Sequence, residues 1–183
     1  VEQINLLERV KAHLEEEKPA RELDYNEEEK VIMKELCLLT IKPMLYVVNV
    51  DENPDMAQIP KLEKSGTEQI VVSAKLEAEL ADLNPVEAVE YLKSAGMTES
   101  GLDKLIKASY KLLDLVTFLT SGEPETRAWT VKANTKAPDA AGVIHTDFVK
   151  GFVKADVCAW QDFVSAGGWG KIKETGKLRL EGK

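Results

Sequence analysis

The sequence has few cysteines and no long apolar run, and these absences exclude several classes of protein. Cys37 and Cys158 are the only cysteines among 183 residues, and they lie far apart. A disulfide framework is therefore not expected, and we predict a reduced, cytoplasmic setting. No apolar run approaches the ~20 residues that a helix needs to span a bilayer, and residues 1–18 contain no signal-peptide core. No membrane partner is expected.

Patterns for phosphate, metal and hydrolytic chemistry are also missing. The chain has no G-x-x-x-x-G-K-[ST] segment, the phosphate-binding loop of P-loop proteins. Residues 167–171 (GGWGK) do not replace it, because neither Ser nor Thr follows Lys171 and no buried strand precedes the glycines. His13 and His145 are isolated, and neither cysteine has a partner at zinc-binding spacing. We interpret His145 as a structural histidine that bonds a backbone group or Asp147, and we predict no catalytic or metal-binding residue.

Charge is distributed unevenly around the net value of −8. Residues 1–115 contain 14 Lys+Arg and 24 Asp+Glu, whereas residues 116–183 contain 10 and 8. This asymmetry indicates two units with different partners, and the acidic one is a poor binder of nucleic-acid backbones. No DNA partner is predicted. The second unit has a basic tail that either contacts ribosomal RNA or forms a solvated strand edge: Lys171, Lys173, Lys177, Arg179 and Lys183.

Residues 1–40 are predicted to be helical. In residues 1–18, apolar side chains recur at spacings of three and four and share one face. This pattern fits an amphipathic packing helix or one arm of an antiparallel coiled coil, and the segment is too short to choose between them. A second helix is expected to begin at Asn26, which forms a capping box with Glu29, and to run to about Leu39.

Residues 41–115 have the pattern of an α/β unit. Residues 44–48 (MLYVV) and 69–74 (QIVVSA) are apolar on both faces, which is typical of parallel strands covered by helices. A crossover with a short helical stretch is expected between them. Helices follow, one of them capped by Asn84 with Pro85 in its first turn. The last helix is expected to bury an apolar face of Leu102, Leu105, Ile106, Leu112, Leu113 and Leu115.

Residues 116–183 change to short strands. The segments VTFLT and TRAWTV flank a turn and predict a hairpin, in which Trp129 is expected to pack in the core. A short helix is expected from about Pro138, followed by further short strands. This pattern indicates a small α+β domain of the ubiquitin-like β-grasp kind. A returning strand is expected after Lys183, so we expect this domain to lack its last strand.

Polar residues follow both predicted strands of the α/β unit. Asn49-Val50-Asp51-Glu52 ends the first strand and Ser73-Ala74-Lys75 ends the second. Ligands of α/β sheets bind at the carboxyl ends of the strands. In P-loop GTPases, loops at these two places carry Asn-Lys-x-Asp and Ser-Ala-Lys and read the guanine. We therefore predict a nucleotide-base site, which comprises Asn49, Val50, Glu52, Ser73, Ala74 and Lys75.

Two of these residues depart from the guanine-reading pattern. Guanine presents adjacent N1–H and N2–H donors that suit an Asp carboxylate, whereas adenine places an N1 acceptor beside its N6 donor. Glu52 is one methylene longer than Asp, and Val50 lacks the lysine stem and charge. Both changes weaken the selection of guanine. We expect adenine to be read by backbone groups and Asn49, with a backbone contact and ring packing from Val50.

Longer segments resemble the YchF-type Obg-like ATPases essentially from end to end, among them LLTIKPMLYVVNVDE, GLDKLIKASYKLLDLVTFLTSGEPETRAWTV and KAPDAAGVIHTDFVKGFVKADV. The resemblance implies a P-loop NTPase core, a helical coiled-coil insertion and a C-terminal TGS domain with a β-grasp fold, in a cytoplasmic protein. It implies hydrolysis of ATP with Mg²⁺, with GTP as a poorer substrate, and association with ribosomes. An N-x-x-E base motif is that family's own variant.

Within that family pattern the chain is expected to be a C-terminal section. Residues 1–40 would belong to the helical insertion, 41–115 to the C-terminal part of the NTPase domain, and 116–183 to the TGS domain. The P-loop and the Mg²⁺ ligands would precede Val1, so this segment alone is predicted to be inactive. Two alternatives stay open: an RNA- or ribosome-binding module in which hydrolysis is secondary, and a helical scaffold that binds partner proteins through residues 1–18.

Overall fold

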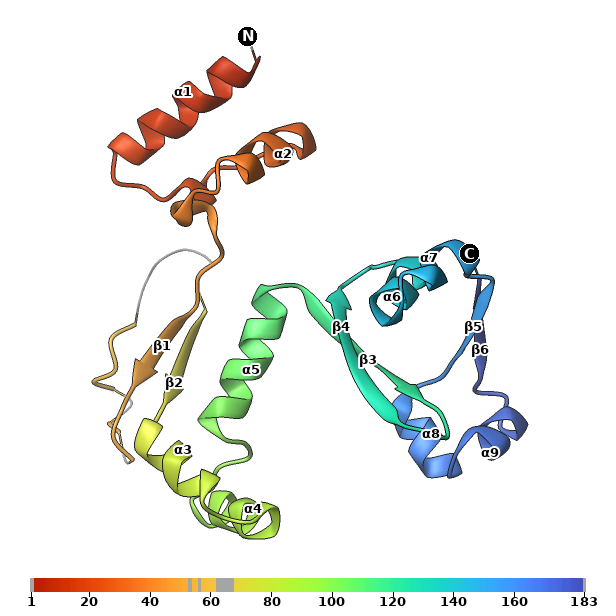
Figure 1. The fold of residues 1–183 in the computed structure, drawn as a ribbon. Helices are drawn as coiled ribbons and strands as arrows, with labels where there is room; N and C mark the ends of the chain where they lie inside the picture. Colours follow the sequence, from red (N-terminus) through yellow and green to blue (C-terminus); the bar gives the residue numbers. More distant parts are fainter. Residues whose placement is uncertain (1, 53, 56, 62–67, 183) are drawn as a thin grey trace. The chain divides into compact units, whose positions relative to one another are not determined.

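A computed structural model of the chain describes residues 2–52, 54–55, 57–61 and 68–182. The chain divides into two compact units, Val1–Leu112 and Leu113–Lys183 (Figure 1). The acidic part of the sequence lies almost wholly in the first unit. The further division of this unit at residue 40 stays a prediction.

The first unit begins with helices α1 (Glu2–Glu15) and α2 (Glu27–Glu35), which pack on a small apolar core. The predicted capping box is confirmed, because Asn26 Oδ1 accepts from the Glu29 N–H at 2.8 Å and Glu29 Oε2 accepts from the Asn26 N–H at 2.9 Å. Short 3₁₀ turns follow each helix at Ala20–Glu22 and Leu39–Ile41. The core residues are Leu6, Val10, Ala20 and Met33.

Both helices end earlier than the sequence pattern predicts. The prediction that helix extends to about residue 18 is wrong, because Glu17 adopts a left-handed conformation with φ of 59° that a helix does not continue through. The second helix stops at Glu35 and not at about Leu39, and Cys37 has φ of 50°. The spacing of apolar residues does not predict where these helices end, because the ends depend on how the following turns pack.

Strands β1 (Tyr46–Asn49) and β2 (Gln69–Val72) form a parallel pair, as predicted. Their expected burial on both faces is wrong: no residue of either strand is buried, and Val47 is 48% exposed. In the described residues this sheet has two strands, so it lacks the neighbours that bury a central strand. The described crossover residues, 54–55 and 57–61, contain no helix; the rest of the predicted helical stretch lies outside the described residues.

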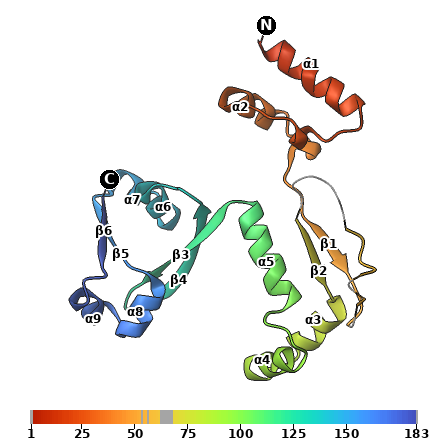
Figure 2. The ribbon, with the colours of Figure 1, turned by 180° about the vertical axis from the view of Figure 1, so that it is seen from behind.

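Helices α3 (Ala74–Ala81), α4 (Pro85–Ser94) and α5 (Gly101–Leu112) complete the first unit. The α4 cap is as predicted, with the Asn84 side chain accepting from the Glu87 N–H at 3.0 Å. Helix α5 lies along β2, as Figure 2 shows from behind.

The predicted apolar face of α5 is buried only in part. Leu102, Ile106 and Leu113 are exposed, whereas Leu105, Leu112 and Leu115 are half-buried. The buried residues of α5 are Gly101 and Ala108, two turns apart. Small side chains occupy these positions because they let the helix approach β2 closely, which a leucine could not do.

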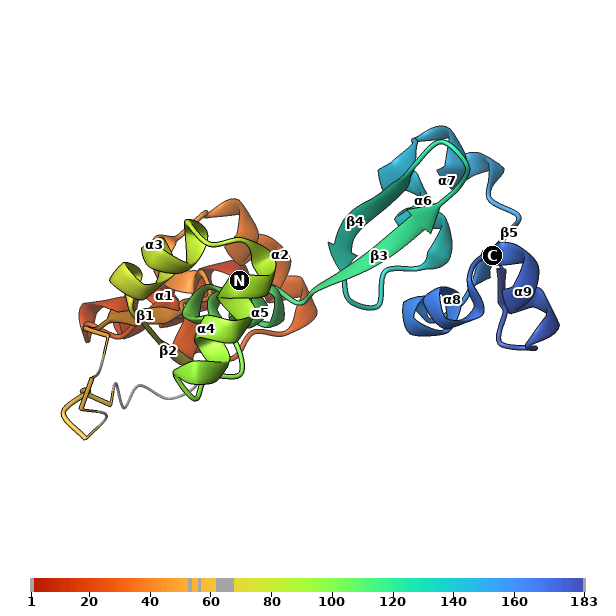
Figure 3. The same ribbon diagram turned by 90° about the horizontal axis from the view of Figure 1, so that it is seen from below.

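The second unit contains two antiparallel strand pairs. The predicted hairpin is confirmed as β3 (Leu115–Ser121) and β4 (Thr126–Lys132), with Phe118 opposite Trp129 (Figure 3). Strands β5 (Lys154–Val157) and β6 (Arg179–Gly182) form a separate pair. The helices of this unit are α6 (Ala137–Ile144), α7 (Asp147–Gly151), α8 (Trp160–Ala166) and α9 (Trp169–Glu174). The unit is a mixture of helices and small sheets, and its β-grasp topology stays a prediction.

The second unit is stabilised by indole hydrogen bonds. Trp169 Nε1 donates to the Ser121 carbonyl at 2.9 Å, and Phe163 packs edge-on against the same indole with ring centroids 4.9 Å apart. Trp129 is half-buried; its Nε1 donates to Thr120 Oγ1 at 2.8 Å, and the Arg127 guanidinium lies 4.3 Å from its ring centroid. These tryptophans are therefore held by contacts within the unit, in keeping with a packing role.

Candidate nucleotide-base site

The parallel register of β1 and β2 brings the two predicted base loops together. Asn49 lies opposite Val72 at the carboxyl ends of the strands, and the Val50 N–H donates to the Val72 carbonyl at 3.0 Å. Asn49 Oδ1 then accepts from the Ala74 N–H at 3.0 Å. One amide side chain thus joins the end of β1 to the start of α3, across 25 residues of sequence.

Ser73 sets the direction in which the second loop leaves β2. It is the N-cap of α3, and its Oγ accepts from the Leu76 N–H at 3.4 Å. The residue is only 8% exposed. Because serine at this position ends the strand and starts the helix at once, the predicted strand 69–74 stops at Val72. Ala74 and Lys75 form the first turn of α3, where backbone N–H groups carry partial positive charge.

Glu52 and Lys75 form an ion pair between the two loops, which the sequence pattern did not predict. Their side chains are 36% and 72% exposed, so the pair contributes little to stability. The Glu52 carboxylate accepts from the ammonium and raises the pKa of Lys75 above its ordinary value, and the charges of Glu79 and Asp51 act in the same direction.

These contacts revise the roles expected of Asn49 and Val50. The Val50 N–H is bonded to the Val72 carbonyl, so the backbone contact expected from Val50 is limited to its carbonyl oxygen. The Asn49 oxygen accepts from the Ala74 N–H, so a ligand at this edge would meet the Nδ2 donor of this side chain. Asn49 is thus both a link between the loops and a hydrogen-bond donor.

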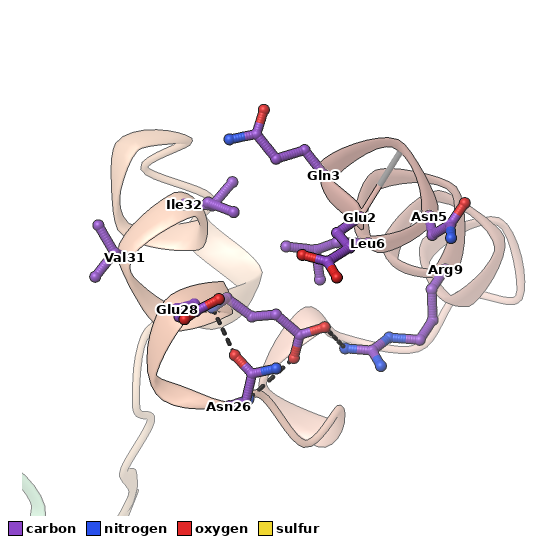
Figure 4. Close-up of a pocket in the computed structure, with 10 residues that line it drawn as sticks. Glu2, Gln3, Asn5, Leu6, Arg9, Asn26, Glu28, Val31 and Ile32 are labelled. Atoms are coloured by element: carbon purple, nitrogen blue, oxygen red, sulfur yellow. Dashed lines mark hydrogen bonds and ion pairs between the residues drawn. The ribbon is translucent and has the colours of Figure 1, made fainter.

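Other candidate sites lie elsewhere or are lacking in the described residues. A groove between α1 and α2 is lined by Leu6, Arg9 and Ile32 among others, and it contains none of the predicted base-site residues (Figure 4). Arg9 crosses it to pair with Glu29 at 3.0 Å. Across the described ranges, no group of three or more His, Cys, Asp or Glu side chains could hold a metal ion, and no helix is long and apolar enough to cross a membrane.

His145 contacts Asp147, as expected from the sequence. Its Nδ1 accepts from the Asp147 N–H at 3.2 Å, and the Asp147 carboxylate lies 3.7 Å from the same nitrogen. The predicted bond to a neighbouring backbone group is therefore present, and a structural role for His145 stays a prediction.

Glu77 is a residue of this region that sequence reasoning missed. Its Oε1 accepts from the Gly101 N–H at 2.7 Å, although 24 residues separate the two. No local pattern points to this contact, because an exposed-looking glutamate in the middle of a helix is ordinary. The one relevant signal is the glycine at the first position of α5, which permits a close approach.

Comparisons with known proteins show which family the chain resembles. A family model named YchF-GTPase_C, described as "Protein of unknown function (DUF933)", matches residues 115–183. The chain is 46% identical over 190 residues to the ribosome-binding ATPase YchF of Bacillus subtilis, covering 99% of this chain and 52% of that protein. It is 42% identical over 187 residues to Obg-like ATPase 1 of Caenorhabditis elegans, covering 97% and 47%.

A solved structure is similar over the whole chain. The Schizosaccharomyces pombe YchF GTPase superposes with a TM-score of 0.84 at 36% identity, covering all of this chain and 51% of that one. These matches are to proteins named YchF or Obg-like ATPase. The chain belongs to the YchF family and matches the C-terminal part of its members. It spans about half the length of the curated relatives that it matches.

Proposed function

We propose that this chain supplies the base-binding edge of a YchF-type nucleoside triphosphatase, and that this edge prefers adenine to guanine. The observation that carries the proposal is the bond from the Ala74 N–H to Asn49 Oδ1, which joins the two loops at the ends of parallel strands. A purine ring lying against this edge would meet Asn49, Val50 and Lys75. This is where ligands of parallel sheets bind.

The donor that would bind a purine at this edge does not distinguish adenine from guanine. The Asn49 Nδ2 group can donate to N7, which both adenine and guanine present as an acceptor. Ser73 and the first turn of α3 support this contact by fixing the Ala74 N–H, and through it the Asn49 side chain. Asn49 thus contributes affinity for purines rather than a choice between them.

Discrimination follows from the Glu52–Lys75 ion pair. A carboxylate that reads guanine must accept from N1–H and N2–H, and Glu52 is instead bonded to the Lys75 ammonium. Guanine would have to compete with the Lys75 ammonium for the Glu52 carboxylate oxygens, or leave its own donors unpaired. The Glu52–Lys75 ion pair favours adenine, because a carboxylate whose charge is neutralised by lysine repels the adenine N1 acceptor less than an unpaired carboxylate does.

In this proposal the catalytic chemistry comes from the P-loop and the Mg²⁺ site that the family resemblance implies. Mg²⁺ and the P-loop are implied by the resemblance to the family, and the described residues provide no cluster of metal ligands. The role of this chain would therefore be to orient the base, and hydrolysis would require the intact protein. Bound Mg²⁺ would supply charge stabilisation at the phosphates.

The wider context of the proposal comes from the relatives. Because the B. subtilis relative is named a ribosome-binding ATPase, we propose that the intact protein also associates with ribosomes, in the cytoplasm, with residues 116–183 folded as a TGS domain of β-grasp topology. No contact in the second unit favours the reading in which that unit carries the main function. The basic tail includes Lys177, which is paired with Asp162 at 2.6 Å.

The test is nucleotide competition in the intact protein. Wild type should bind ATP more tightly than GTP, and the double variant Val50→Lys, Glu52→Asp should shift the ratio of the two dissociation constants toward GTP by about tenfold or more. The matched control is Val89→Lys, Glu90→Asp, which makes the same two changes on exposed positions of α4. If the base-loop variant keeps the wild-type ratio, the proposed preference is wrong.

A further inference from the structure

The Glu77 carboxylate connects the second base loop to a helix that does not touch the base site. Glu77 lies one turn after Ser73 on α3, and its backbone N–H donates to the Ser73 carbonyl at 3.0 Å. Its side chain accepts from the Gly101 N–H at 2.7 Å, at the first residue of α5. A carboxylate at a helix N-terminus is stabilised by the positive end of the helix, and its hydrogen bond is charge-assisted.

The packing around this contact leaves little freedom. Gly101 is buried, and a Cβ atom added to it would lie 3.0 Å from Glu77 Oε1 and 3.0 Å from Val72 Cγ1. The first turn of α5 is therefore wedged between the Glu77 side chain and the last residue of β2. A rotation of α3 would either break the Glu77–Gly101 bond or press Glu77 into the backbone of α5.

A second, weaker contact holds the other end of α5. Lys111 Nζ lies 3.4 Å from Glu68 Oε2, and Glu68 directly precedes β2. Both side chains are exposed, so this pair alone adds little. The Glu77 bond joins α3 to the first residue of α5, and α5 in turn lies along β2 (Figure 1).

We propose that Glu77 is a positioning residue for the base site. By bonding Gly101 it fixes the orientation of α3, and so keeps the Ala74 N–H where Asn49 Oδ1 can accept from it. Glu77 itself touches no base and acts through Ala74 and Lys75. This inference rests on the proposed function of the edge, and the experiment below separates the failure of one from the failure of the other.

The experiment uses the intact protein with Glu77→Ala, Glu77→Gln and, as the matched control, Glu90→Ala on the exposed face of α4. Each is titrated with ATP and with inorganic tripolyphosphate, which carries phosphates without a base. We expect Glu77→Ala to weaken ATP about fivefold, the loss of one hydrogen bond, and to leave tripolyphosphate at the wild-type affinity. Hydrogen exchange at the Gly101 amide should accelerate in the same variant.

Rescue by the conservative variant is the second readout. Glu77→Gln keeps an acceptor oxygen at the same position, so we expect it to protect the Gly101 amide and to bind ATP within about twofold of wild type. Glu90→Ala should match wild type in every measurement. Recovery by glutamine and not by alanine supports positioning through the hydrogen bond.

Three outcomes would overturn the proposal. One is ATP affinity unchanged in Glu77→Ala although the Gly101 amide exchanges faster. Another is equal weakening of ATP and tripolyphosphate, which marks a general loss of structure. The third is seen in wild type alone: if ATP binds no more tightly than tripolyphosphate, no base is recognised, and the proposed function falls together with the role of Glu77.

Discussion

The hydrogen bond between Asn49 and Ala74 is the contact on which the proposed base site depends, and two substitutions separate the two roles proposed for Asn49. Asn49→Ala removes both the acceptor for the Ala74 N–H and the Nδ2 donor. Asn49→Asp keeps an acceptor oxygen for Ala74 and adds a negative charge near the start of α3, but it has no donor for N7 of the base. Asn49→Ala should therefore loosen the link between the two loops. Asn49→Asp should keep this link but weaken the binding of the base.

The magnitude follows from the setting of the bond. A neutral intramolecular hydrogen bond contributes about 0.5–1.5 kcal/mol net. Asn49 is exposed, so the lower half of that range applies, which corresponds to a change in affinity of about two- to fivefold. For Asn49→Asp the carboxylate would face the N7 acceptor, so we expect ATP binding to be weaker than in Asn49→Ala.

Two measurements on the intact protein test this order. Hydrogen exchange at the Ala74 amide should be faster in Asn49→Ala and close to wild type in Asn49→Asp. Calorimetric titration with ATP should give the affinity order wild type, then Asn49→Ala, then Asn49→Asp. The reasoning is refuted if Asn49→Asp binds ATP as wild type does, or if the Ala74 amide exchanges at the same rate in all three proteins.

Two further predictions concern packing and pH. Gly101→Ala should destabilise the first unit by about 1–3 kcal/mol, because its Cβ would meet Val72 and Glu77 at 3.0 Å. Thermal unfolding should show a lowered midpoint. Gly170→Ala, where nothing lies within 4 Å of the added Cβ, should instead leave the midpoint unchanged or raise it, because alanine loses less conformational entropy than glycine on forming a helix. The Asn26 N–H and the Arg9 guanidinium hold the pKa of Glu29 in the folded protein below its usual range. Ionised Glu29 therefore stabilises the fold fully at pH values above its pKa in the unfolded chain. This stabilisation is lost as the pH falls through the pKa of Glu29 in the folded protein. Glu29→Gln should therefore flatten the acid side of the stability curve, and an unchanged acid limb would contradict this.

Local chemistry was readable from the sequence wherever a residue acts on its own near neighbours. The capping boxes at Asn26 and Asn84 were predicted and are present, since both depend only on residues three positions apart. The β3–β4 hairpin was predicted for the same reason, from alternation on both sides of a turn. The presence of base-loop residues at two strand ends was likewise visible, because the strand pattern and the polar residues are consecutive in the chain.

Tertiary structure decided what depends on residues distant in the sequence. The burial of α5 is complete at Gly101 and Ala108 and only partial at its leucines, and it is set by how closely the helix approaches β2. The Glu52–Lys75 pair and the Glu77–Gly101 bond each join segments more than twenty residues apart, and neither has a periodic signature. The sequence by itself determined which residues stand at the edge of the sheet. Only the fold decided that the Asn49 oxygen accepts from the Ala74 N–H and that Lys75 neutralises the charge of Glu52. The reason is that side-chain pairing depends on distance in space and not on spacing along the chain.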